Sequence, residues 1–108
     1  MTEQPNLEYL KQFSGGDQAF EKKLFTVLKK EFPVEKETYF QNLKLNNFKL
    51  ASENVHKIKH KISILGLEKS YQLATEHENN LRESNASLKD EFQTVLNVIT
   101  DFLETLNY

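Results

Sequence analysis

The clearest hydrophobic pattern in the chain lies between residues 48 and 65, where apolar side chains recur at steps of three and four. These positions are Phe48, Ala51, Val55, Ile58, Ile62 and Leu65. Such steps keep side chains on one face of an α-helix, as in helices that pack in a bundle. Gly66 follows, and glycine readily takes the left-handed conformation that ends a helix. The pattern therefore predicts an amphipathic helix that stops at Gly66.

Two further amphipathic helices are predicted after Gly66. The first runs from Leu67 to about Glu83, and its buried positions are Leu67, Ser70, Ala74, His77 and Leu81. Polar turn formers at 84–87 end it, and Ser87 with Asp90 resembles a capping box. The last helix runs from Leu88 to about Leu106, with buried positions Leu88, Phe92, Val95, Ile99, Phe102 and Leu106.

The N-terminal half shows the same periodicity with interruptions. A short helix from about Leu7 to Phe13 is predicted to end at Gly15 and Gly16, and Asp17 is a good N-cap for the next helix. That helix has its apolar positions at Phe20, Leu24, Val27, Leu28 and Phe32. Pro33 should kink it or restart it as a segment from Val34 to about Leu45, with Tyr39, Phe40 and Leu43 on its apolar face.

Composition supports helices over strands, because the chain has only three Gly and two Pro and strands need frequent turns. Its 108 residues are enough for one domain. Long amphipathic helices joined by short turns favour antiparallel neighbours. We therefore expect an all-α protein, a single domain over 1–108, built as an antiparallel four-helix bundle with a short additional N-terminal helix.

Charge and composition exclude several function classes. The formal charge is −2, with 14 basic and 16 acidic side chains interspersed, so nucleic acid is not an expected partner. The chain has no Cys, and no apolar run approaches a membrane span or a secretory signal. Phosphate-binding glycine loops, serine elbows and paired carboxylates for a di-iron site are also missing. The sequence predicts a cytoplasmic monomer without autonomous enzyme activity.

His56 is the residue whose side chain is best suited to take part in a reaction. It lies about 130° around the predicted helix from the apolar face, so its imidazole should face solvent. Its neighbours within about one turn on that face are polar, namely Lys49, Ser52, Glu53, Lys59, His60 and Ser63. A neutral exposed imidazole is a nucleophile, and Lys59 is placed to bind a phosphoryl oxygen. The same spacing also fits a solvated helix face that happens to contain a His and several Lys.

The run Val55-His56-Lys57-Ile58-Lys59 followed by Gly66 resembles the motif of histidine-containing phosphotransfer (HPt) domains, A-H-x-L-K-G-S-x-x-x-L-G. Upstream residues also resemble the first half of that family, so the resemblance covers nearly the whole chain; they are Leu10, Gly15, Gly16, Asp17, Phe20, Leu24 and Pro33. It implies a four-helix bundle in which His56 accepts a phosphoryl group, Lys59 stabilises it and Gly66 ends the helix.

The resemblance also implies partners. The chain would carry phosphate between aspartates of response-regulator receiver domains in a multistep phosphorelay that begins at a hybrid sensor histidine kinase. It would need no cofactor of its own, because the receiver domain supplies Mg²⁺. Lys57, His60, Ser63 and Ile64 are the candidate docking residues. Ile64 is equally well explained as a flank of the bundle core.

Two departures from the motif matter for docking. His60 replaces the family's small Gly four residues after the phosphoacceptor, and Lys61 replaces the following Ser. A degenerate adaptor, which binds a receiver domain without phosphotransfer, is therefore one alternative. A metal-binding protein is another, because His56 and His60 share a helix face and Glu53 is a candidate third ligand, although nearby lysines oppose a dication. His77 lies on a buried stripe, where we expect a structural histidine held by a hydrogen bond.

Overall fold

A computed structural model describes residues 4–5, 11–12 and 14–105 of the chain. It contains four α-helices, and no strand occurs in this described part. Their bounds are α2 (Gln18–Lys44), α3 (Phe48–Ile64), α4 (Glu68–Arg82) and α5 (Lys89–Thr105). The expected all-α class is confirmed. The short helix expected at about Leu7 to Phe13 lies almost wholly outside the described residues.

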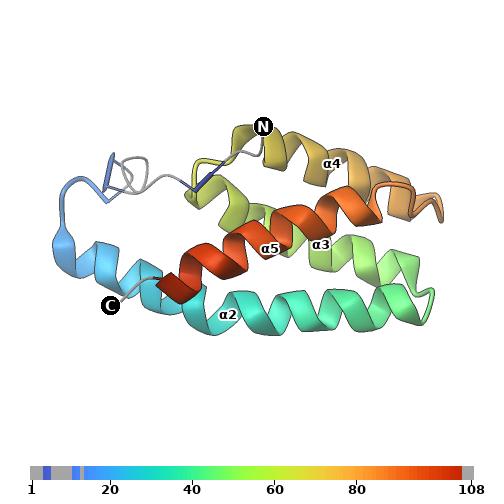
Figure 1. Ribbon diagram of the computed structural model, residues 1–108, viewed down its shortest axis with the longest axis horizontal. Coiled ribbons are helices and arrows are strands. Elements are labelled where there is room, and N and C mark those ends of the chain that lie inside the picture. The colour runs from blue at the N-terminus through green and yellow to red at the C-terminus, as the bar shows by residue number, and fades with distance from the viewer. Residues whose placement is uncertain (1–3, 6–10, 13, 106–108) are drawn as a thin grey trace.

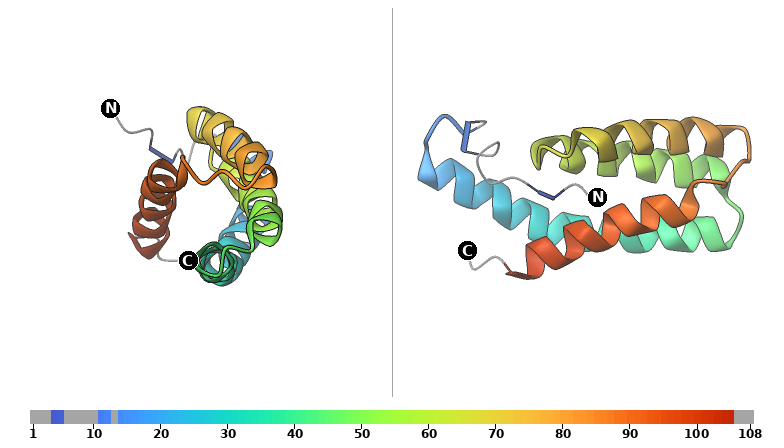
Figure 2. Two further views of the ribbon diagram at one scale, coloured as in Figure 1. Left: turned by 90° about the vertical axis from the view of Figure 1, so that its right-hand side faces the viewer. Right: turned by 45° about the horizontal axis from the view of Figure 1, so that its top comes forward.

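The four helices run alternately in opposite directions and are joined by short turns (Figure 1). In the end-on view of Figure 2 they follow one another around a ring in chain order. The packing agrees, because α3 contacts α2 and α4 most extensively, and α5 closes the ring against α4 and α2. This is the antiparallel bundle expected from short connections between amphipathic helices.

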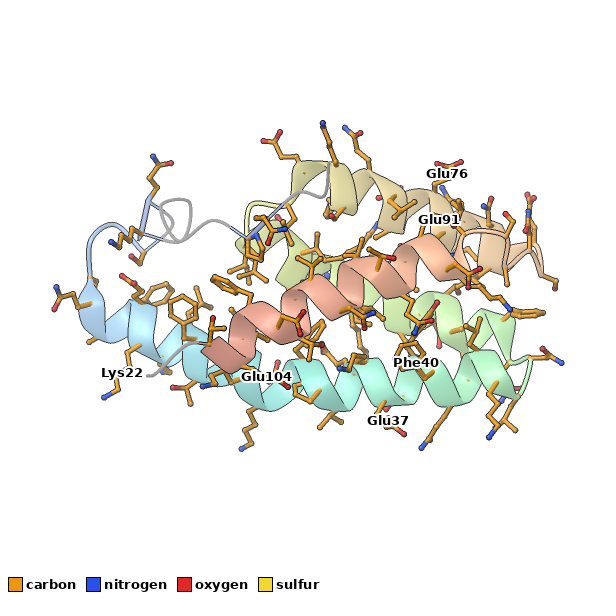
Figure 3. The ribbon with its side chains drawn as sticks, in the orientation of Figure 1. Lys22, Glu37, Phe40, Glu76, Glu91 and Glu104 are labelled. Atoms are coloured by element: carbon orange, nitrogen blue, oxygen red, sulfur yellow. The ribbon has the colours of Figure 1, made fainter. Side chains whose placement is uncertain are left out.

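The bundle core is built largely from the predicted stripes, with Phe25, Leu96 and Leu103 as further members. Ser70, Leu88 and Phe102, which were expected in these stripes, are only half-buried, and Leu106 lies outside the described residues. In α3, Ala51, Val55, Ile58 and Ile62 are fully buried, and Leu65 at the end of the helix is buried as well. Side chains from α2, α4 and α5 complete the cluster; they include Phe25, Leu28, Phe32, Tyr39, Ala74, Leu81, Phe92, Leu96 and Ile99. Figure 3 shows the same division along α2, where Glu37 points away from the bundle and Phe40 lies on its inner side.

Pro33 does not divide α2, so the expected restart at Val34 is wrong. The helix continues for 27 residues with Pro33 inside it. The Pro33 ring is on the exposed side of α2, where water can reach the backbone and the missing N–H costs the helix least. Phe32 and Tyr39, on either side of the proline, are both buried and hold the two halves of the helix against the same core.

The N-terminal part of α2 extends past the end of α3 (Figure 1). At 1.5 Å per residue α2 is about 40 Å long, whereas the 17-residue helix α3 spans about 26 Å. Phe20 and Val27, which were expected in the core, are 44% and 37% exposed, because they lie off the buried face of α2, which runs through Glu21, Phe25, Leu28 and Phe32. Phe25, which was not expected there, is fully buried.

The predicted helix ends are mostly confirmed. Asp17 caps α2 by accepting hydrogen bonds from the N–H groups of Ala19 (3.0 Å) and Phe20 (3.1 Å). Gly66 has φ +72°, the left-handed conformation expected just after a helix. The start of α5 differs, because Asn85 Oδ1 accepts from Ser87 N–H and the helix begins only at Lys89. Within the described residues, no helix combines the length and apolar character needed to cross a membrane.

Candidate functional site

The middle of α3 presents His56 to solvent, as predicted. Val55 and Ile58 anchor this turn of the helix in the core, and the His56 side chain on the other face is 55% exposed. Because α3 is fixed on both sides by α2 and α4, the position of His56 is set by the bundle and not by a loop. The residue therefore combines access for a partner with a rigid backbone.

Behind His56 lies Glu78 of α4, a carboxylate that is only 3% exposed. Its Oε2 is 3.4 Å from His56 Nδ1, and its Oε1 is 2.9 Å from Lys59 Nζ. Arg82, one turn further along α4, donates from Nη2 to Glu78 Oε2. One buried carboxylate therefore gathers a histidine, a lysine and an arginine from two helices.

This contact favours one tautomer of the imidazole. An ionised carboxylate only accepts hydrogen bonds, so the His56 nitrogen that faces it, Nδ1, is favoured as the protonated one. The lone pair of the neutral ring is then on Nε2, the nitrogen that does not face Glu78. Nε2 is therefore the nitrogen of His56 with the available lone pair.

Glu78 remains ionised in spite of its position. Burial raises the pKa of its carboxyl, but the hydrogen bond and charge of Lys59, with the charges of Arg82 and His56, outweigh burial and hold the pKa below its ordinary value. The carboxylate therefore keeps its charge at neutral pH. It compensates the cations around it.

Lys59 is less exposed than the sequence predicts. Its side chain is only 12% exposed, because Nζ is drawn between α3 and α4 to Glu78. Nζ also lies 3.4 Å from Thr75 Oγ1 and 5.2 Å from the centre of the Tyr71 ring, both on α4. Lys59 therefore links the two helices as well as lying one turn from His56.

His60 is exposed and lies directly beside the candidate nucleophile. The rings of His56 and His60 meet edge to face, with centres 5.3 Å apart and planes at 87°. An imidazole thus occupies the surface that a glycine would leave open. Any partner that reaches His56 from this side also touches His60.

Lys61, the second departure from the motif, turns away from this surface. Its Nζ is 2.9 Å from Glu31 Oε1 and 3.1 Å from Glu35 Oε2, both on α2. Burial lowers the pKa of Lys61, but its hydrogen bonds to the two carboxylates outweigh burial and raise the pKa overall. Lys61 joins α3 to α2 and does not obstruct His56.

The other candidate docking residues lie around the same surface. Lys57 and Ser63 are exposed, whereas Ile64 is half-buried against the core, which favours its role as a bundle flank. A hollow of about 530 Å³ beside His56 includes Lys57 and Arg82 in its walls. A second hollow, of about 280 Å³, is lined by Ser63 and other residues of the turn between α3 and α4.

Ser52 was expected on the exposed face but is buried, and its hydroxyl donates to the Lys49 carbonyl at 2.6 Å.

His77 is a structural histidine, as expected. It is fully buried, and its Nε2 is hydrogen-bonded to the Tyr39 hydroxyl at 2.7 Å. Burial, opposed in part by the charge of Glu91, lowers the pKa of His77 to about 4, so the ring is neutral at physiological pH.

A metal site with three protein ligands is not assembled in the described part of the chain, which holds no cluster of three or more His, Cys, Asp or Glu suited to a metal ion. Glu53 is exposed and does not complete such a cluster with His56 and His60. The alternative of a dedicated metal-binding protein therefore lacks its third ligand.

The contacts of Glu78 with His56, Lys59 and Arg82 were not predicted from the sequence. Glu78 follows the buried position His77 and stands four residues before Arg82, so a carboxylate at the edge of an apolar stripe was the available signal. Its contact with His56 depends on the packing of α4 on α3.

No family model, curated protein or solved structure matches this chain.

Proposed function

We propose that this chain is a phosphotransfer protein that carries a phosphoryl group on His56 between aspartates of receiver domains. The observation that carries the proposal is the pairing of an exposed imidazole with a buried carboxylate, at 3.4 Å between His56 Nδ1 and Glu78 Oε2. A carboxylate in this place holds the proton on Nδ1 and leaves Nε2 free to attack. The resemblance of the α3 sequence to HPt domains supplies the reaction.

The transfer step is an in-line displacement at phosphorus. The lone pair of His56 Nε2 forms a bond to the phosphorus of an aspartyl phosphate, while the bond from phosphorus to the aspartate oxygen breaks and leaves a carboxylate. The imidazole ring gains positive charge as the new bond forms. Glu78 stabilises that charge through Nδ1–H, in a position that needs no rearrangement during the reaction. Transfer to the next aspartate is the reverse displacement.

Lys59 and Arg82 provide positive charge around Glu78, behind the His56 imidazole. Both contact Glu78, so their places on the surface are fixed before a phosphoryl group arrives. Negative charge on the phosphoryl oxygens is stabilised by cations already held in position. Glu78 thus acts as a positioning residue for the imidazole and for both cations.

The phosphoryl group must come from another protein under this proposal. The described residues form one helical bundle, and the family resemblance gives this bundle the role of a carrier that receives its phosphoryl group from a partner. The expected donor and acceptor are receiver domains, each with its own aspartate and Mg²⁺, and a hybrid sensor histidine kinase that feeds the first of them. These partners follow from the family resemblance.

The test is phosphorylation by a receiver domain. The protein is incubated with a phosphorylated receiver, or with an active hybrid kinase and labelled ATP, and the label is tested for lability in acid and stability in base. Label should appear on the unaltered chain and be absent from His56→Gln, whereas His60→Gln should still accept it. Label that persists in His56→Gln and disappears from His60→Gln would contradict the assignment.

A second candidate function is that of an adaptor that binds a receiver domain without accepting phosphate. The observation in its favour is the His60 ring, which packs against His56 on the surface that a receiver must approach. The adaptor would show binding by titration calorimetry and no acid-labile label in the same experiment. One set of samples therefore separates the two candidates.

A further inference from the structure

The exposed pair formed by His56 and His60 has the dimensions of a metal-binding pair. A ring nitrogen lies about 1.1 Å from its ring centre and about 2.0 Å from a bound zinc ion, so two imidazoles on one tetrahedral ion have centres about 5.1 Å apart. The two rings of this pair are 5.3 Å apart. The rings lie edge to face, with planes at 87°, so one of them has to turn about its side-chain bonds before both direct a nitrogen toward a shared ion. Both side chains are exposed, which leaves room for this turn.

Glu78 adds the support that such a ligand usually has. Histidines that bind metals commonly hold their other ring nitrogen against a carboxylate, which fixes the tautomer and strengthens the free nitrogen as a ligand. His56 has this arrangement, with Nδ1 at 3.4 Å from the buried Glu78 carboxylate. Its Nε2 therefore has an available lone pair that can bind a metal ion as well as a phosphorus atom.

Two of the nearby lysines oppose a dication less than the sequence suggests, whereas Lys57 is exposed beside His56. Lys59 is paired with Glu78 at 2.9 Å, and Lys61 is paired with Glu31 and Glu35 on α2. Each of these ammonium groups already has a carboxylate in contact, which offsets its field at the histidine pair. The pair itself stays open to solvent.

We propose that His56 and His60 together bind one Zn²⁺ ion, with water in the remaining positions of the tetrahedron. With only two protein ligands the site is open and reversible, unlike a closed structural zinc site. Because the ion takes His56 Nε2, it excludes the phosphoryl group from the same atom. Zinc binding is independent of the proposed function, whereas inhibition of phosphotransfer by zinc rests on it.

Zinc affinity of the whole protein is measured by competition with a chromophoric zinc indicator at neutral pH. We expect one ion per chain, with affinity at least tenfold lower in His56→Gln and in His60→Gln, since each variant removes one of two ligands. Glu78→Gln should weaken binding by about tenfold through the lost support of His56. Excess Mg²⁺ should not displace the zinc, because Mg²⁺ prefers oxygen ligands.

Two matched variants serve as controls. Glu53→Gln tests an exposed carboxylate about one turn before His56 on α3, and Glu104→Gln tests an exposed carboxylate on α5 (Figure 3). Both should keep zinc affinity within twofold of the unaltered protein, and far-UV circular dichroism verifies that every variant is helical. The proposal is overturned if His60→Gln binds zinc as tightly as the unaltered chain, if Glu53→Gln loses tenfold, or if Mg²⁺ competes.

The consequence for phosphotransfer is measured separately. Zinc at saturating concentration should reduce the label accepted from a phosphorylated receiver by at least tenfold, and a chelator should restore it. His60→Gln should accept label at a rate that zinc does not change, which also shows that zinc does not act on the receiver. If the chain accepts no label in the absence of zinc, the phosphotransfer proposal is wrong. The zinc titration still tests the zinc-binding proposal independently.

Discussion

Replacing Glu78 by Gln tests the central element of the site, because the change keeps the size and shape of the side chain and removes its charge. Glu78 is 3% exposed and contacts His56, Lys59 and Arg82. After the change Lys59, which is 12% exposed, has no carboxylate partner at position 78. The variant should therefore be less stable, and its His56 ring should lose the preference for the Nδ1–H tautomer.

The size of the stability loss follows from what each partner can still do. Removing one member of a fully buried ion pair costs about 3 to 5 kcal/mol. Here the carbonyl oxygen of the substituted amide can still accept a hydrogen bond from Lys59, and the exposed His56 and Arg82 can turn to water. We therefore expect the free energy of unfolding to fall by about 2 kcal/mol, or the melting temperature by about 10 °C for a domain of this size.

The pH dependence gives a second, independent signature. The pKa of Glu78 is lower in the folded chain than its ordinary value of 4.5, so the folded state takes up this proton only at lower pH than the unfolded state does. Its stabilisation is complete above pH 4.5 and is lost as pH falls through the folded pKa. The stability gap between the unaltered protein and Glu78→Gln should therefore be wide at pH 7 and narrow as the solution is acidified below pH 4.5.

Urea unfolding followed by circular dichroism, at several values between pH 7 and pH 3, measures this gap. Glu76→Gln is the matched control, since Glu76 is on the same helix but exposed, and it should change stability by less than about 0.5 kcal/mol (Figure 3). Imidazole ¹⁵N shifts should also show His56 losing its preference for the Nδ1–H tautomer. An unchanged stability at pH 7, or a gap that does not narrow in acid, refutes the reasoning.

Four further changes test separate parts of the structure and the site. Lys59→Ala should slow phosphotransfer five- to hundredfold in single-turnover assays, and equal rates would leave Lys59 as a link between helices only. Pro33→Ala should raise the free energy of unfolding by about 1 to 3 kcal/mol in urea titrations, because alanine supplies the backbone N–H that proline lacks and removes its ring from a continuous helix; a loss of stability would contradict this. Tyr39→Phe should cost about 1 to 3 kcal/mol by leaving His77 without its hydrogen bond, and a neutral effect would show that the 2.7 Å contact adds nothing. His77→Phe should remove a loss of stability between pH 6.5 and about pH 4, because the unfolded chain protonates this ring before the folded chain does.

The helix α3 was predicted well because the spacing of its apolar residues fits only an amphipathic helix. Steps of three and four from Phe48 to Leu65 and a glycine at 66 determine both the buried face and the end of the helix, and the exposure of His56 follows. Prediction failed at Pro33, where the pattern shows the residue but not which side of the helix its ring takes. It also failed at Phe20 and Val27, because the face of α2 that is buried runs through Glu21, Phe25, Leu28 and Phe32 and leaves both residues to one side.

The candidate site was predictable only as far as it lies on one helix. His56, Lys59 and His60 share α3, so helical spacing alone places them near one another. Glu78 joins them across the interface between α3 and α4. The relative position of two packed helices along their axes cannot be predicted from the hydrophobic periodicity of either helix. For the same reason the burial of Lys59, which depends on a partner in α4, was not foreseen.

The most direct test of the account is the position of the phosphoryl group after transfer from a phosphorylated receiver domain. In a chain labelled with ¹⁵N-histidine, coupling between ³¹P and ¹⁵N identifies the nitrogen that carries phosphorus. The account predicts one phosphoryl group on His56 Nε2, with Nδ1 still protonated toward Glu78. Phosphate on His60, phosphate on His56 Nδ1, or a receiver that binds and transfers nothing would contradict it.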